Sequence, residues 1–188
     1  MTLNGRGLLL WAACLAALAT PFAWREGPFG GGGGGQAGAG TLTDAEARDV
    51  LRARLADVYG AFGQTEEFAI YDGIARAVTP SLTTDLYLQR RQAQMVEETW
   101  GAPTEILAFD LTAASMVGQD ASRIHMAAEW QVTGQVGHGD HTHERTNAYA
   151  ARVTLARAEG EWRLSAFNLD RIVLEEIVED PLFFGGFE

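Results

Sequence analysis

The spacing of apolar residues changes once along this chain, near residue 104, and that change limits the folds the chain can adopt. Between residues 42 and 100 apolar side chains recur every three or four positions, the period of an amphipathic helix. After residue 104 they recur at every second position, the period of a half-buried strand. The sequence therefore predicts an α+β domain with its helices first and its strands last.

The first predicted helix has a clear start and a single apolar stripe. Thr43 followed by Glu46 three residues later is the pattern of a capping box, and Gly63 ends the helix. Its stripe consists of Leu51, Leu55, Val58 and Phe62.

Two further helices are predicted before the change of period. The second runs from about residue 66 to 78, where Thr79-Pro80 stops it. Its expected buried face is Phe68, Tyr71, Ile74, Ala75 and Val78. The third ends at Gly101, with an inner face of Leu82, Leu86, Ala93 and Val96. Arg90-Arg91 on this helix is interpreted as a solvated face.

Four strands are predicted after residue 104. Three of them begin at about residues 107, 124 and 141, and the fourth begins at Trp162 after a turn at Ala158-Glu159-Gly160. In the first strand Leu107, Phe109 and Leu111 should face one way. Short turns between successive strands predict a curved, mainly antiparallel sheet, and the three helices are its only available cover. The domain is expected to span residues 41–172, followed by an acidic, frayed tail over 173–188.

An apolar segment and a glycine-rich linker precede the domain. Residues 1–25 carry Arg6 and then an apolar run, and two interpretations stay open: a cleaved export signal, or an uncleaved anchor held in the membrane. Residues 26–40 are mostly glycine and are expected to form a flexible linker. Both interpretations place the domain outside the cytoplasm, in the cell envelope or secreted.

Charge and cysteine content exclude several classes of protein. The net charge is −11; residues 1–40 contribute +1 through Arg6, Arg25 and Glu26, so the remainder carries −12. An acidic surface repels phosphate backbones, so no nucleic-acid partner is expected. The single Cys14 lies in the apolar run, so the domain has neither an internal disulfide nor a cysteine-based zinc site.

Helices followed by a bent antiparallel meander resemble the nuclear transport factor 2-like superfamily of cone-shaped α+β domains. The resemblance covers residues 41–172 and rests on element order and on the stretch from Glu129 through Tyr149. It implies a pocket between helices and sheet, and sheet-mediated dimers are common in that superfamily. It does not imply a reaction, because the superfamily includes isomerases, dehydratases and cyclases as well as non-catalytic binding domains.

One group of residues could carry chemistry, at the start of the third strand. Strand alternation places five side chains on the face that becomes core further along: His141, His143, Arg145, Asn147 and Tyr149. Three interpretations stay open. In the first, the strand end protrudes beyond the helices and its side chains are exposed to solvent. In the second, these side chains line a polar pocket. In the third, His138, His141 and His143 hold a metal ion. Arg145 on the same face opposes a cation, so no metal and no cofactor are expected.

Two functions follow from these patterns. The first is a membrane-tethered, extracytoplasmic binding or interaction domain whose partner is an unidentified small molecule or protein, with homodimerisation open. The second is a small-molecule enzyme of the isomerase, dehydratase or cyclase type that uses the histidines as acid and base. The catalytic residues of such an enzyme are unknown from sequence, and whether the chain is an enzyme is left undecided.

Overall fold

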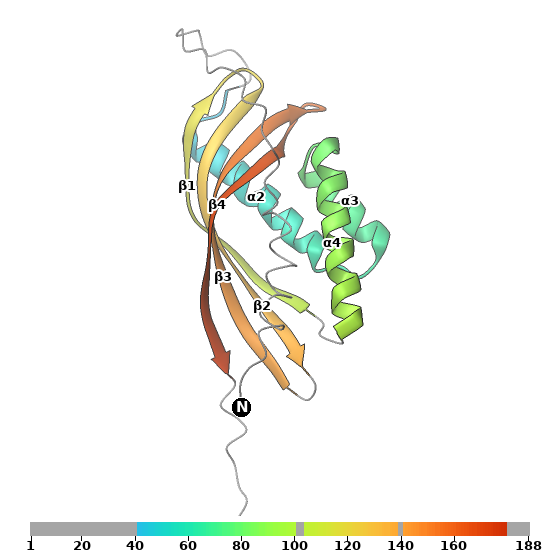
Figure 1. Ribbon diagram of the computed structural model, residues 1–188. Helices are drawn as coiled ribbons and strands as arrows, with labels where there is room; N and C mark the ends of the chain where they lie inside the picture. Colours follow the sequence, from blue (N-terminus) through green and yellow to red (C-terminus); the bar gives the residue numbers. More distant parts are fainter. Residues whose placement is uncertain (1–40, 101–103, 139–140, 180–188) are drawn as a thin grey trace, which may run out of the picture.

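A computed structural model describes residues 41–100, 104–138 and 141–179, and the fold is three helices packed against one sheet (Figure 1). The helices are α2 (Asp44–Phe62), α3 (Glu67–Ala77) and α4 (Pro80–Trp100). The strands are β1 (Thr104–Gln119), β2 (Arg123–His138), β3 (His141–Ala158) and β4 (Glu161–Glu179). They form an antiparallel sheet in the order β1-β2-β3-β4. The predicted α+β class is confirmed, while the predicted export segment and glycine-rich linker lie outside the described residues.

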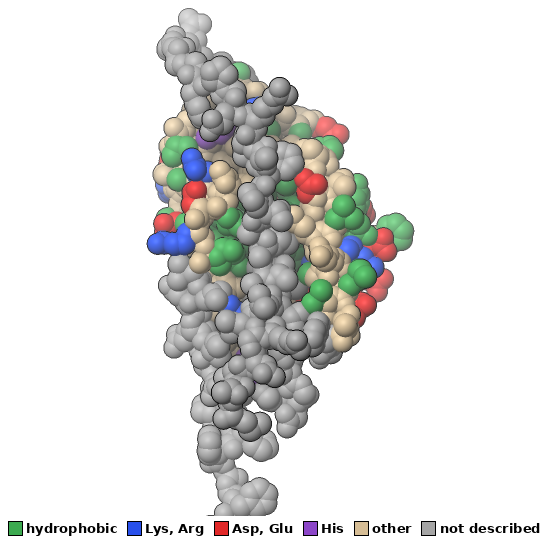
Figure 2. All heavy atoms as spheres, in the orientation of Figure 1, with side chains coloured by type: hydrophobic (Ala, Val, Ile, Leu, Met, Phe, Trp, Pro, Cys, Tyr) green, Lys and Arg blue, Asp and Glu red, His purple; other side chains and the backbone are tan. Residues whose placement is uncertain are grey.

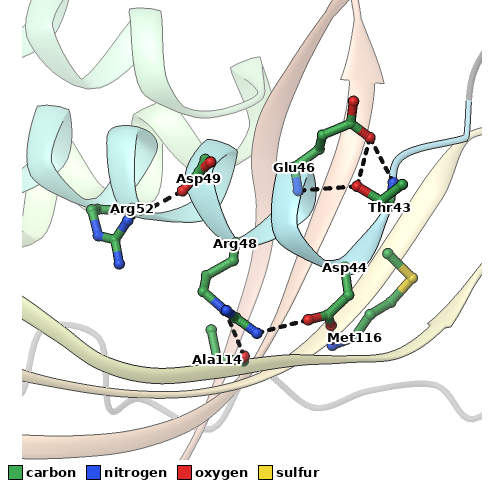
Figure 3. Close-up of polar contacts among 8 residues, drawn as sticks. All are labelled: Thr43, Asp44, Glu46, Arg48, Asp49, Arg52, Ala114 and Met116. Carbon is green, nitrogen blue, oxygen red and sulfur yellow. Dashed lines mark hydrogen bonds and ion pairs between the residues drawn. The ribbon is translucent and has the colours of Figure 1, made fainter.

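Helix α2 begins with the predicted capping box (Figure 3). The Glu46 backbone N–H donates to Thr43 Oγ1 at 3.3 Å, and the Thr43 backbone N–H donates to Glu46 Oε2 at 2.8 Å. These bonds satisfy donors that the first turn of a helix otherwise leaves open. The bonds that the Thr43 backbone N–H and hydroxyl donate to Glu46 Oε2 hold the pKa of Glu46 below its usual value. The start of α2 is therefore fixed by local sequence.

Side chains of α2 also hold the helix to both edge strands of the sheet. Asp44 Oδ1 accepts from the Met116 backbone N–H at 2.6 Å, and Arg48 Nε donates to the Ala114 carbonyl at 3.1 Å (Figure 3). Arg54 Nε donates to the Trp162 carbonyl on β4 at 2.9 Å. Edge strands expose backbone groups that can pair with other chains. Helix α2 therefore covers part of each edge while crossing the sheet.

The core lies between the three helices and the side of the sheet that faces them. The four predicted stripe residues of α2 are buried, and so are alternate residues along β2: Ile124, Met126, Ala128, Trp130 and Val132. At the C-terminal end of α2, Trp130 Nε1 donates to Tyr59 Oη at 2.8 Å, and the Tyr59 ring stacks on Phe109 at 5.3 Å between centroids. Burial raises the pKa of Tyr59 well above its usual range, so the phenol stays protonated and available for this bond.

The predicted buried face of helix α3 is correct at Ile74 and Val78 but wrong at Phe68 and Tyr71. Its buried residues are Ile70, Gly73, Ile74 and Ala77, while Phe68 is 83% exposed and Tyr71 is 44% exposed. The cause is a close approach to α2: a Cβ on Gly73 would lie 2.6 Å from the Ala61 Cβ. Helix α3 has apolar residues on two of its faces. The face that carries Gly73 packs against α2, because glycine lets the backbones of the two helices come closest.

Strands β1 and β4 depart from the predicted pattern. The pairing of β1 with β2 shifts between Ile106 and Ala108, so Leu107 falls in a bulge and is 46% exposed instead of inward. Strand β4 pairs with β3 as far as Glu179, beyond the expected domain end at residue 172. Residues 180–188, the rest of the predicted tail, lie outside the described part.

None of the helices in the described ranges is both long and apolar enough to cross a bilayer. The predicted anchor over residues 1–25 lies outside those ranges.

Candidate functional site

Strand β3 places most of the predicted site residues on the helix-facing side of the sheet. Arg145 is 8% exposed, Asn147 1% and Tyr149 2%, and His143 is half-buried. The alternate residues Thr142 and Glu144 are exposed. The predicted shared face is confirmed for the four described side chains. The interpretation of a wet strand end is wrong for Arg145 and Asn147, because both are buried.

The other two histidines are placed by backbone pairing only. His138 at the end of β2 pairs with His141 at the start of β3. Their side chains lie outside the described part of the structure, so the predicted three-histidine set is not placed. Among the side chains that are described, no group of three or more His, Cys, Asp or Glu could hold a metal ion.

The polar residues begin where α2 ends. Tyr149 stacks on Trp130 with ring centroids 5.4 Å apart and planes at 17°, and Trp130 bonds Tyr59 in the last turn of α2. Two residues further toward the start of β3 comes Asn147, and two further again Arg145. We call His143, Arg145 and Asn147 the polar end of the sheet. It adjoins an aromatic pair on one side, an arrangement typical of sites that bind a molecule with both polar and flat apolar parts.

Neighbouring strand β2 places one apolar residue and one glycine opposite the polar end. Val132 pairs with Asn147 and Gly134 pairs with Arg145. Glycine has no side chain, so β2 offers only its backbone next to the guanidinium. No hydrogen-bond donor among the described residues reaches the buried Asn147 Oδ1. A buried carbonyl in this state costs about 1–3 kcal/mol unless a partner satisfies it.

Burial also sets the electrostatics of the polar end. It lowers the pKa of Arg145, because removal from water disfavours the charged form, and the nearby Tyr149 hydroxyl acts in the opposite direction. The guanidinium remains charged at every physiological pH. A fixed positive charge in a shielded site favours a carboxylate, a phosphate or a polar oxygen as the contacting group.

Helix α4 carries buried polar residues that the sequence did not indicate. Arg90 was expected to be solvated, yet it is 7% exposed, and its Nη1 lies 3.0 Å from Glu97 Oε1. Gln94, between them on the same face, is 8% exposed. Residues seven apart on a helix share a face, so the spacing of Arg90 and Glu97 is the sequence feature that could have predicted this ion pair. Because each charge has a partner, this pair is tolerated in the interior.

The polar end offers three kinds of polar group. The polar end has a fixed cation, an amide and one imidazole, His143. Isomerases and dehydratases usually add a carboxylate or a second acid–base group at the reacting atom. Among the described side chains, Glu97 on α4 is a largely buried carboxylate, and it is paired with Arg90. The arrangement therefore suits binding through charge and hydrogen bonds.

Comparison with known proteins gives little further information. No family model matches the chain, and no curated protein matches it. Among solved structures, the crystal structure of the intermembrane space region of chloroplast protein ARC6 is similar over 69% of this chain and 97% of that one, with a TM-score of 0.49 and 12% identity. A likeness of that size transfers neither fold nor function.

Proposed function

We propose that this chain is a membrane-tethered, extracytoplasmic binding domain, and that a polar ligand contacts Arg145 and Asn147 at the polar end of the sheet. The observation that carries the proposal is the Asn147 side chain, 1% exposed, whose carbonyl oxygen no described donor reaches. A ligand with a hydrogen-bond donor would satisfy that oxygen, and an anionic or carbonyl group would contact Arg145. Helices followed by an antiparallel meander support, within the same proposal, a nuclear transport factor 2-like domain.

The ligand part of the proposal is tested by thermal shift with a panel of small carboxylates, phosphates and amides. A ligand at 100 times its Kd stabilises a protein by about 2.7 kcal/mol, which raises the melting temperature by roughly 6–10 °C. Compounds that stabilise the unaltered chain should stabilise Glu144→Gln equally, because Glu144 is exposed on the opposite face. They should not stabilise Asn147→Leu. Equal shifts in all three proteins, or no shift in any, would contradict the proposal.

The location is proposed from the sequence alone. Arg6 precedes the apolar run, while Arg25 is offset by Glu26 after it, so the net positive charge is larger before the run, and we expect that flank to stay in the cytoplasm. A reporter enzyme that is active only outside the cytoplasm, fused after Glu188, should be active. Activity of a reporter that works only in the cytoplasm would contradict the location.

One observation favours the alternative, an enzyme that uses histidine for acid–base chemistry. His143 is half-buried, its Nδ1 is shielded from solvent, and it lies one step along the same face from buried Arg145. If His143 transfers a proton, His143→Gln should abolish turnover of any compound that the thermal shift identifies, while the stabilisation by that compound persists. Undiminished turnover in this variant would exclude His143 as the acid or base.

A further inference from the structure

A cluster of exposed apolar side chains lies on the outer surface of α3 and α4, away from the polar end. Phe68 is 83% exposed, Tyr71 44% and Leu88 59%. The Tyr71 and Tyr87 rings meet edge to face with centroids 5.5 Å apart, so the two helices contribute to one surface. We call these four residues the aromatic patch. Single exposed apolar residues are ordinary, whereas several on two helices whose aromatic rings meet indicate an interaction surface.

The aromatic patch is held in place by a polar contact. Tyr87 Oη donates to Glu67 Oε1 at 2.6 Å, which ties α4 to the first turn of α3. This bond stabilises the protonated phenol and is the main reason that the pKa of Tyr87 is raised. The ring is therefore oriented before any partner arrives. Pre-orientation of an aromatic side chain reduces the entropy lost on binding.

The surroundings of the aromatic patch are acidic. Four exposed carboxylates border it along the two helices: Glu66, Glu67, Asp72 and Asp85. Arg76 and Arg91 are the basic residues of the same surface, so its formal charge is two minus four, or −2. Figure 2 shows hydrophobic and acidic side chains next to one another along the edge of the molecule formed by these helices. Residues 41–188 together carry −12, so the field around this surface is negative.

This charge decides between the possible occupants. A second copy of the chain would bring an identical acidic surface and be repelled, and an anionic membrane surface would be repelled likewise. We infer that the aromatic patch docks a segment of a different protein, one that presents apolar side chains flanked by lysine or arginine. Phe68, Tyr71 and Leu88 would enter the apolar centre of that interface, and the carboxylates would meet the basic flanks at its rim.

The inference is tested by photo-crosslinking in the full chain, expressed in its own cells. A benzophenone side chain replaces Tyr71, and the matched control carries it at Val117, an apolar β1 residue that is 62% exposed outside the aromatic patch. We expect a discrete adduct from position 71 alone, mapped by peptide mass spectrometry to an apolar, net-basic segment of another protein. An adduct with lipid, with a second copy or with an acidic segment would overturn the inference, and so would the absence of any adduct.

A second measurement separates docking from folding. Phe68→Ser with Leu88→Ser removes the most exposed members of the aromatic patch, and the melting temperature should stay within about 2 °C because neither residue is in the core. A synthetic peptide of the mapped segment should bind this variant at least about tenfold more weakly than the unaltered chain. Asp72→Lys with Asp85→Lys should also weaken binding and remove its dependence on salt. Unchanged peptide binding in both variants would overturn the inference.

Discussion

Strand β3 presents one side to the helices along its whole length, yet the two halves of that side are unlike. Toward its C-terminal end, Val153 and Leu155 belong to the core that α2 covers. Toward its start, Asn147 and Arg145 lie beyond Tyr149, which reaches the last turn of α2 through Trp130, and both are polar. Alternation and burial are the same in both halves. The change from apolar to polar side chains on this face therefore coincides with the last turn of α2, which ends at Phe62.

The largest expected effect lies in the covered half. Leu155→Ala would leave a cavity in a fully buried site and should lower the free energy of unfolding by about 2–5 kcal/mol. Urea denaturation followed by tryptophan fluorescence measures the change. Arg157→Ala, exposed on the same strand, is the control and should change stability by less than about 0.5 kcal/mol. Equal effects would mean that this half is not the core.

A smaller effect is expected at the start of the covering helix. Thr43→Ala removes the N-cap of α2 and should cost about 1 kcal/mol, measured in the same way. The bonds from Thr43 keep the folded-state pKa of Glu46 below its usual value of 4.5. This contribution to stability is therefore present above pH 4.5 and is lost as the pH falls through the lower, folded value. Glu46→Gln should lose less stability on acidification than the unaltered chain; an identical pH profile would show that the bond does not form in solution.

The polar half should respond in the opposite direction. Asn147→Leu replaces a buried amide by an apolar side chain of similar volume, so the free energy of unfolding should be unchanged or raised by up to about 1 kcal/mol. A loss of more than about 2 kcal/mol would show that Asn147 is a structural member of the core, and the contrast between the halves would disappear.

The addition of zinc should change the protein least, because we expect no tight zinc site at the polar end. Arg145 lies two residues, roughly 7 Å, along the strand from His143, and a fixed cation at that distance opposes a metal ion. Calorimetry of the full chain should show no stoichiometric zinc binding at submicromolar concentration. His141→Ala with His143→Ala should change binding of a ligand or partner more than it changes stability. Tight, stoichiometric zinc binding that this variant loses would make the polar half a metal site.

Local patterns were enough to predict the elements but not which apolar face is covered. The capping box at Thr43 and the alternation along β2 and β3 were read correctly because each depends on near neighbours in sequence. Phe68 and Tyr71 were misplaced because α3 has two apolar stripes, and contact with α2 at Ala61 chooses between them. Such a choice depends on tertiary contact that periodicity does not contain.

The burial of the candidate residues could be predicted from the sequence in part. The alternation of β3 gave Arg145, Asn147 and Tyr149 on a buried face, as observed. The buried pair of Arg90 and Glu97 was missed because arginine on a helix is usually solvated, and only the packing of α4 reveals the exception. Strand β1 has a bulge at Leu107, and the extra residue moves the Leu107 side chain to the other face of the sheet. No sequence pattern predicted this bulge.

Gly73 is buried, yet it affects the position of the aromatic patch on the surface. The absent methyl lets α3 lie against Ala61, and the resulting rotation of α3 turns Phe68 and Tyr71 outward. Gly73→Ala would push the two helices apart, and with them the aromatic patch, without altering any side chain that a partner touches. If the aromatic patch docks a partner, the choice of partner could therefore change through substitution of an interior residue, and a survey of surface substitutions alone would overlook that residue.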